Sequence, residues 1–190
     1  MTDTKSITEI VQDVAGTQKS ETERVEAQEQ VVVFELDHEE YGVKITDIKE
    51  IIKVPEITPI PDAPDYVKGI LNLRGGIVVV IDLEKRIHLV QSAEVKEKKH
   101  IIIAELDKNI FGIEIDQVLE VLRIPVSKIK KSPANLASKV QEAYIKGVVV
   151  LENGTTSRLI IMLDLPALLS EKNLNEFEGK VALAASPVKK

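Results

Sequence analysis

The chain has 190 residues, a formal net charge of −6, no cysteine, no Trp, three Phe and three Tyr. The lack of cysteine excludes disulfides, thiolate metal sites and cysteine nucleophiles, and agrees with a reducing compartment. The acidic charge and the few aromatic rings disfavour nucleic acid as a ligand. Since no stretch approaches ~18 consecutive apolar residues, we expect a soluble, cytoplasmic protein.

The ends of the chain differ from its middle. Residues 1–29 have scattered apolar positions, too few to anchor a packed element, and no continuous apolar run of the kind found in a secretory signal. We therefore predict a flexible N-terminal tail over 1–29, a folded domain over 30–172, and a C-terminal helix or tail over 173–190.

An internal repeat organises the folded part. Residues 31–55, VVVFELDHEEYGVKITDIKEIIKVP, align without a gap to residues 101–125, IIIAELDKNIFGIEIDQVLEVLRIP. Two shorter blocks also recur: 66–70 as 144–148, and 77–83 as 159–165. The repeat predicts two lobes of one design, about 31–90 and 100–165, and leaves open an exchange of strands at their boundary.

Each copy follows the pattern of strand, tight turn, strand, connection, strand, glycine turn and strand. The prolines between 55 and 64 cannot donate to a sheet ladder, so that segment is predicted as a connection. Periodicity does not decide between helix and strand for 45–52. A helix is predicted over 165–172 with Asp164 as its N-cap. Short strands at this spacing predict a mainly all-β fold of small barrels.

The sequence contains no convincing catalytic constellation. His38, His88 and His100 lie in a turn or near strand ends, and no two of them have helical ligand spacing. Asp82 and Asp164 end apolar strands at matched places, where strand termination and helix capping explain them better than acid–base catalysis. We predict no catalytic residue, no cofactor and no metal, and keep as an alternative a small hydrolase that combines one of these aspartates with a histidine.

One polar site is different. The segment 66–76, YVKGILNLRGG, places Arg74 beside a glycine turn, with Asn72 two residues earlier. A planar guanidinium can hold a partner's carboxylate or carbonyl groups with a geometry that lysine cannot copy. The second copy has Glu152 at the corresponding place. We therefore expect function to lie where the two lobes differ.

The segments EEYGVKITDIKEI and PDAPDYVKGILNLRGGIVVVIDL, in this order and spacing, resemble the CheW family of chemotaxis coupling proteins over roughly residues 30–172. The resemblance implies two side-by-side, five-stranded, SH3-like β-barrels. It also implies a non-catalytic adaptor that binds the cytoplasmic tips of chemoreceptors and the regulatory domain of the histidine kinase CheA. Such an adaptor would lie at membrane-associated receptor arrays without entering the membrane.

The resemblance also implies roles for particular residues. Receptor binding falls on Ile48, Glu50, Asn72 and Arg74, and turn geometry on Gly69 and Gly75. The second lobe is implied to meet the kinase. The chain departs from the family pattern in the run Val78-Val79-Val80, where a proline is frequent, and in its long N-terminal tail. The alternative is a generic two-barrel adaptor for another signalling kinase or motility system, which only the identity of the partner would distinguish.

Overall fold

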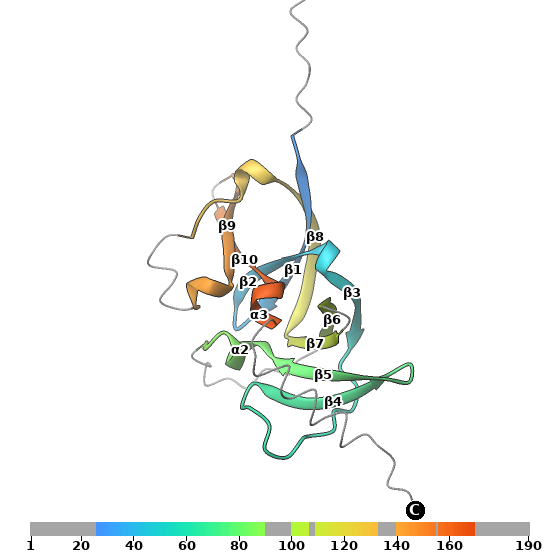
Figure 1. Ribbon diagram of the computed structural model, residues 1–190. Helices are drawn as coiled ribbons and strands as arrows, with labels where there is room; N and C mark the ends of the chain where they lie inside the picture. The colour runs from blue at the N-terminus through green and yellow to red at the C-terminus, as the bar shows by residue number, and fades with distance from the viewer. Residues whose placement is uncertain (1–25, 90–99, 107–108, 133–139, 155, 170–190) are drawn as a thin grey trace, which may run out of the picture.

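The computed structural model describes residues 26–89, 100–106, 109–132, 140–154 and 156–169. The predictions for residues 1–25 and 170–190 lie outside this part of the chain. Within it, strands dominate and the helices are short, so the prediction of a mainly β protein is confirmed (Figure 1). None of the helices in the described part is both long and apolar enough to cross a membrane.

In the described part of the chain, ten strands form two five-stranded sheets, which we call sheet A and sheet B. Sheet A has the order β8-β1-β2-β10-β9 and contains β1 (Gln28–Leu36), β2 (Glu39–Lys44), β8 (Gln117–Pro125), β9 (Ile145–Asn153) and β10 (Thr156–Leu163). Sheet B has the order β3-β6-β7-β5-β4 and contains β3 (Ile48–Lys53), β4 (Val67–Leu73), β5 (Gly76–Asp82), β6 (His100–Leu106) and β7 (Asn109–Ile115). The helical turns are η1 (Ile45–Asp47), α2 (Leu83–Arg86), η2 (Val126–Lys128), η3 (Glu142–Tyr144) and α3 (Leu165–Leu169).

Each sheet takes strands from both copies of the repeat. The hairpin β1–β2 of the first copy joins β8, β9 and β10 of the second, while β6–β7 of the second copy joins β3, β4 and β5 of the first. The exchanged hairpins attach through parallel pairs, β2 with β10 and β5 with β7, whereas the other pairs are antiparallel. β1 also begins at Gln28, so two residues assigned to the tail belong to sheet A.

Both sheets curl until their edges meet. In sheet B the chain after β3 reaches β4, and Thr58 and Ile70 exchange two backbone hydrogen bonds of 2.8 Å. In sheet A the chain after β8 reaches β9, where Lys130 and Val148 do the same at 2.9 and 2.7 Å. These bridges give each five-stranded sheet a barrel-like form, in agreement with the predicted SH3-like fold.

A glycine permits each closure. Gly69 lies inside β4 and not in a turn, with φ +152°, and a Cβ there would lie 2.2 Å from the carbonyl oxygen of Thr58. Gly147 holds the matching place in β9, where a Cβ would lie 2.7 Å from the carbonyl oxygen of Lys130. In each barrel the two bridged segments can approach this closely only because the glycine has no side chain.

Strands β1 and β6 are buried on both faces, which explains their continuous apolar runs. Val31 and Val33 pack inside sheet A, while Val32 and Phe34 enter the large core between the sheets. In β6 the same alternation separates Ile101 and Ile103 from Ile102 and Ala104. The runs VVVF and IIIA thus supply the interior of each barrel and the joint between them at once.

The tight turn of the first copy and the predicted cap are present, whereas the matching turn of the second copy, at residues 107–108, lies outside the described residues. Asp37 and His38 have φ of 47° and 65° between β1 and β2, as a two-residue type I′ turn requires. Asp164 Oδ1 accepts a hydrogen bond from the Ala167 amide at 2.9 Å, so the predicted start of the last helix is confirmed. Segment 45–52 forms the short 3₁₀ turn η1 followed by strand β3, and not an α-helix.

Candidate partner-binding site

The turn between β4 and β5 presents Arg74. Leu73 pairs with Gly76, and between them Arg74 and Gly75 have φ of 52° and 87°, again a two-residue turn. Asn72 Oδ1 accepts a hydrogen bond from the Gly75 amide at 2.8 Å. Asn72 and Gly75 therefore build the turn, and this leaves Arg74 at its tip.

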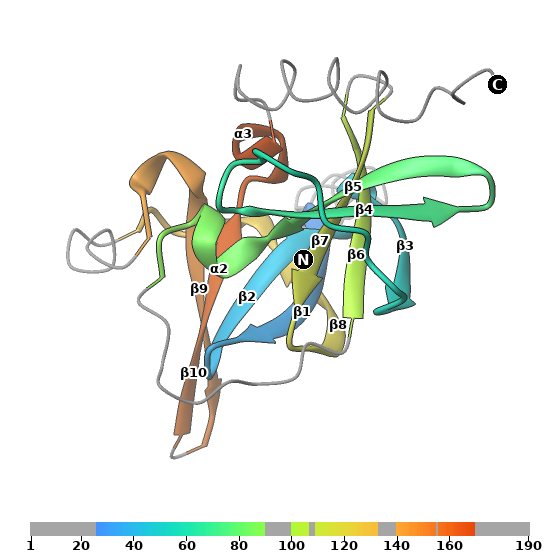
Figure 2. The same cartoon turned by 90° about the horizontal axis from the view of Figure 1, so that it is seen from below.

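Arg74 joins the two edges of sheet B. Its Nη2 donates to Oε2 of Glu50 on β3 at 2.9 Å, and the β4–β5 hairpin projects beside β3 in Figures 1 and 2. The Arg74 side chain is 78% exposed and that of Glu50 28% exposed. One carboxylate occupies only part of a five-donor guanidinium, so the fork retains donors for a second ligand.

Ile48 and Glu50 lie on opposite faces of β3, because the strand register shifts between them: Ile48 pairs with Ala104 and Glu50 with Ile103. Ile48 is half-buried and packs against the core between the sheets, so part of its side chain is already covered. The structure therefore brings Glu50, Asn72 and Arg74 to one end of sheet B and places Ile48 nearer the joint with sheet A.

Two exposed apolar side chains near this site were missed by the sequence reasoning. Ile51 of β3 is 37% exposed, and Ile77 of β5, which pairs directly with Asn72, is 43% exposed. The alternation of Lys49, Ile51 and Lys53 is a signal that could have placed Ile51 on the outer face. No comparable signal marks Ile77, because it opens a continuous apolar strand.

Sheet A contains a related ion pair that the repeat alignment did not reveal. Glu120 is the counterpart of Glu50, and its Oε1 lies 2.8 Å from Nη1 of Arg158 on β10. Arg158 also binds Glu40 through Nη2 at 2.8 Å. The hydrogen bonds that Arg158 donates to Glu40 and then to Glu120 raise its pKa further above the ordinary value.

The two pairs differ in what they leave available. Arg158 is 32% exposed and contacts two carboxylates, whereas Arg74 is 78% exposed and contacts one. Glu152, which the alignment set opposite Arg74, is exposed on β9. The asymmetry between the lobes is thus real, but it lies in the exposure of an arginine that both lobes possess.

The aspartates proposed for a hydrolase have structural roles. Asp82 Oδ1 accepts from the Lys85 amide at 3.2 Å and caps α2, as Asp164 caps α3. His38 and His88 have positive φ and exposed side chains. Among the described residues, no group of three or more His, Asp or Glu is arranged to hold a metal ion.

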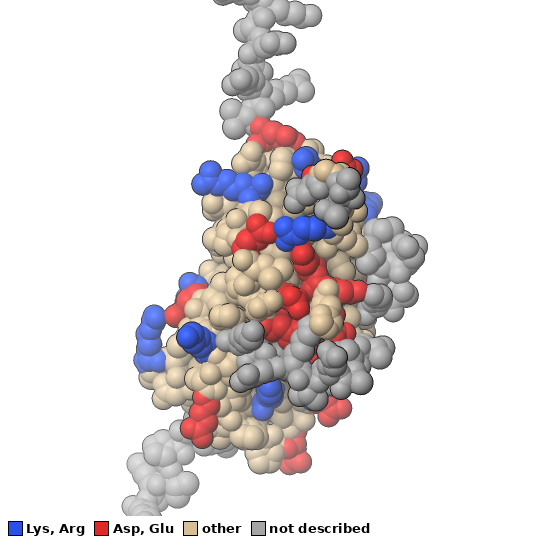
Figure 3. Space-filling view, turned by 180° about the vertical axis from the view of Figure 1, so that it is seen from behind, with Lys and Arg blue, Asp and Glu red and all other residues tan. Residues whose placement is uncertain are grey.

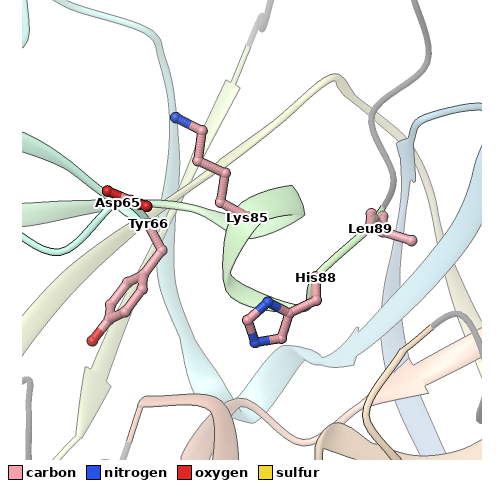
Figure 4. A pocket seen from close by; sticks show the side chains of 5 residues that line it. All are labelled: Asp65, Tyr66, Lys85, His88 and Leu89. Carbon is pink, nitrogen blue, oxygen red and sulfur yellow. The ribbon is translucent and has the colours of Figure 1, made fainter.

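A shallow pocket of about 650 Å³ lies beside α2, lined by Asp65, Tyr66, Lys85, His88 and Leu89. Its side chains do not converge: the Lys85 ammonium and the Tyr66 hydroxyl point away from one another (Figure 4). Asp82 and Asp164 are absent from the lining. The pocket therefore does not assemble the aspartate–histidine pair that a hydrolase of this kind needs.

Charge on the back of the molecule is unfavourable for nucleic acid. Figure 3 shows acidic side chains gathered near the middle of that face, with Lys and Arg dispersed around them. A phosphate backbone is attracted by continuous basic surface, which this face does not offer.

A solved structure resembles this fold closely enough to define its class. The crystal structure of a scaffolding protein from Thermoanaerobacter tengcongensis matches with a TM-score of 0.65 and 33% sequence identity, covering 77% of this chain and 96% of that one. The two curled β-sheets and this match together place the chain in the same class of β-rich fold as that scaffolding protein.

The family follows from the sequence comparisons. The model of the CheW-like domain matches residues 30–173. A chemotaxis protein CheW from Treponema pallidum is 36% identical over 150 residues, covering 77% of this chain and 85% of that protein. One from Bacillus subtilis is 31% identical over 152 residues, covering 80% and 94%. The chain belongs to the CheW family.

Proposed function

We propose that this protein is a non-catalytic scaffold that couples chemoreceptors to the histidine kinase CheA in bacterial chemotaxis. Membership of the CheW family supports the scaffold role, since the relatives are named chemotaxis proteins and the solved neighbour a scaffolding protein. The cytoplasmic tip of a receptor and the regulatory domain of the kinase are the two proposed partners. The site of action is the cytoplasm, at membrane-associated receptor arrays.

The observation that carries the receptor assignment is the Arg74–Glu50 pair, which joins the β4–β5 turn to β3. The hydrogen bond from the Gly75 amide to Asn72 holds the backbone of the two-residue turn, so the position of Arg74 is set before a partner binds. Its remaining donors suit a carboxylate or a helix-terminal carbonyl on a receptor tip. The exposed side chains of Ile51 and Ile77 add apolar surface beside this polar anchor.

A binding experiment tests this assignment. The purified chain is titrated with a soluble cytoplasmic fragment of a chemoreceptor and, separately, with the regulatory domain of CheA, using Arg74→Ala and Arg74→Lys. Lys128→Ala, which removes an exposed cation of the turn η2, is the matched control. We expect both Arg74 variants to weaken the receptor arm, because lysine keeps the charge but loses the planar fork.

The expected pattern is a receptor affinity reduced about tenfold or more by Arg74→Ala, an unchanged kinase affinity, and no effect of Lys128→Ala on receptor binding. Equal loss in both arms would indicate a damaged fold and contradict a local role for Arg74. Binding to neither partner in the unaltered chain would leave the family and fold intact and refute the proposed partners.

A further inference from the structure

The lysines Lys68 and Lys146 occupy matched positions in the two copies of the repeat but meet opposite neighbours. On β4, Lys68 Nζ lies 2.5 Å from Oε2 of Glu114, a β7 carboxylate whose side chain is 2% exposed. The counterpart of Glu114 is Lys44 of β2. In sheet A, therefore, Lys146 has Lys44 as its neighbour, whereas in sheet B the equivalent Lys68 has the carboxylate of Glu114.

A single carboxylate serves both lysines of sheet A. Glu29 of β1 places Oε1 2.5 Å from Lys44 Nζ and 3.9 Å from Lys146 Nζ. Lys44 has the short contact, and Lys146 is left at the longer distance beside a like charge. Asp47 of η1 acts on both ammonium groups, but only through longer-range attraction.

These surroundings act on the two amines in opposite directions. Burial and then the neighbouring Lys44 lower the pKa of Lys146, and Glu29 and Asp47 only partly oppose this. The hydrogen bond to Glu29 raises the pKa of Lys44. At a given pH, more of Lys146 than of an ordinary lysine is the neutral amine, which is the nucleophilic form.

We propose that Lys146 is an acylation site, at which the amine accepts an acyl group from a small acyl phosphate. The neutral Nζ attacks the carbonyl carbon of the donor, and a C–N bond forms as the bond between carbon and the phosphate oxygen breaks. Inorganic phosphate leaves, and the amine proton passes to water. The product is a neutral amide, so the repulsion with Lys44 disappears while the Lys44–Glu29 contact remains.

Solvent exposure alone predicts the opposite order of reactivity for Lys68 and Lys146, so the two lysines of one molecule can test the proposal. Lys68 is 44% exposed and Lys146 34% exposed, so a reaction governed by access favours Lys68 or treats both alike. The experiment incubates the full chain with limiting acetyl phosphate and measures initial acetylation of each lysine by mass spectrometry after cleavage at glutamate. We expect Lys146 to react several-fold faster than Lys68, because Glu114 holds the Lys68 ammonium at 2.5 Å whereas Lys146 lies 3.9 Å from a carboxylate that it shares with Lys44.

The variant Lys44→Met tests the cause. Without Lys44, Glu29 can pair with Lys146 directly, so acetylation of Lys146 should slow while that of Lys68 stays unchanged. Acetylation of Lys68 at the rate of Lys146 or above it, in the unaltered chain, would overturn the proposal without any variant. An unchanged rate at Lys146 in Lys44→Met would overturn it as well.

Stability gives a second readout. Lys146→Gln, which imitates the neutral product, should leave the melting temperature unchanged or raise it. Lys68→Gln should lower the melting temperature, because it leaves the buried Glu114 carboxylate without its ion-pair partner. A loss of stability in Lys146→Gln equal to that in Lys68→Gln would show that Lys146 is a structural cation and would refute the proposal.

Discussion

Arg86 donates hydrogen bonds from Nε and Nη2 to the carbonyl oxygen of Leu168, at 3.1 and 2.9 Å, and Leu168 occupies the place of Arg86 in the second copy of the repeat. The guanidinium carbon also lies 5.0 and 4.8 Å from the ring centres of Tyr66 and Tyr144, which are counterparts of one another. The two copies thus meet around one buried cation, whose side chain joins α2 to α3.

This junction predicts a large stability effect. Arg86→Met should lower the free energy of unfolding by about 3 kcal/mol, since it removes two cation–π contacts and leaves a buried carbonyl unpaired. Urea denaturation measures the change. Lys85→Met, which alters the exposed neighbour on α2, should change stability by less than ~0.5 kcal/mol. Equal effects of the two substitutions would contradict a specific role for the junction.

The closure of sheet B predicts a difference between two glycines. Gly69→Ala should lower the free energy of unfolding by about 3 kcal/mol or more, because the Cβ would overlap the Thr58 carbonyl. Gly75→Ala has open space and bears only the strain of a positive φ, about 1–2 kcal/mol. Thermal unfolding of both variants checks the order; a more damaging Gly75→Ala would show that the bridge at Thr58 contributes little.

The Arg74–Glu50 pair can be separated from partner binding by exchanging its charges. The double variant Glu50→Arg/Arg74→Glu keeps an ion pair across the same two edges, so unfolding should stay within ~1 kcal/mol of the unaltered chain, as for an exposed pair. Receptor binding should remain as weak as in Arg74→Ala, because the guanidinium has moved from the turn to β3. If calorimetric titration shows restored binding, the pair acts only as a structural link.

Tyr41 predicts a pH dependence. Burial, followed by the charge and hydrogen bond of Glu39, raises the pKa of Tyr41 far above its ordinary value, while in the unfolded chain a tyrosine ionises near pH 10. The contribution of Tyr41 to the free energy of unfolding is therefore complete below pH 10, and it falls at higher pH by about 1.4 kcal/mol per pH unit.

The variant Tyr41→Phe isolates this contribution. At pH 7 it should be about 1 kcal/mol less stable, because it lacks the hydrogen bond to Glu39. Between pH 10 and pH 11 the difference should shrink, since phenylalanine does not ionise. Urea titrations of both proteins across this range give the comparison; a constant difference would mean that Tyr41 ionises equally in both states.

Much of the local structure could be read from the sequence. The repeat, the runs VVVF and IIIA, and the capping by Asp164 depend on periodicity and on contacts between close neighbours, and each is present. The placement of Asn72, Arg74 and Gly75 in one turn could also be read this way, since these residues are near in sequence. Gly69 was assigned to a turn, because a lone glycine does not reveal a close approach by another segment.

What the sequence determined by itself is therefore the strands, their buried faces and the existence of two equivalent copies. Only the tertiary structure showed that the hairpins are exchanged between the sheets. It also showed that Arg158, and not Glu152, forms the ion pair of sheet A that corresponds to Arg74–Glu50, and that Lys146 shares Glu29 with Lys44. The reason is physical: hydrophobic periodicity reports which face of a strand is buried, whereas the choice of neighbouring strand depends on pairing between segments far apart in the chain.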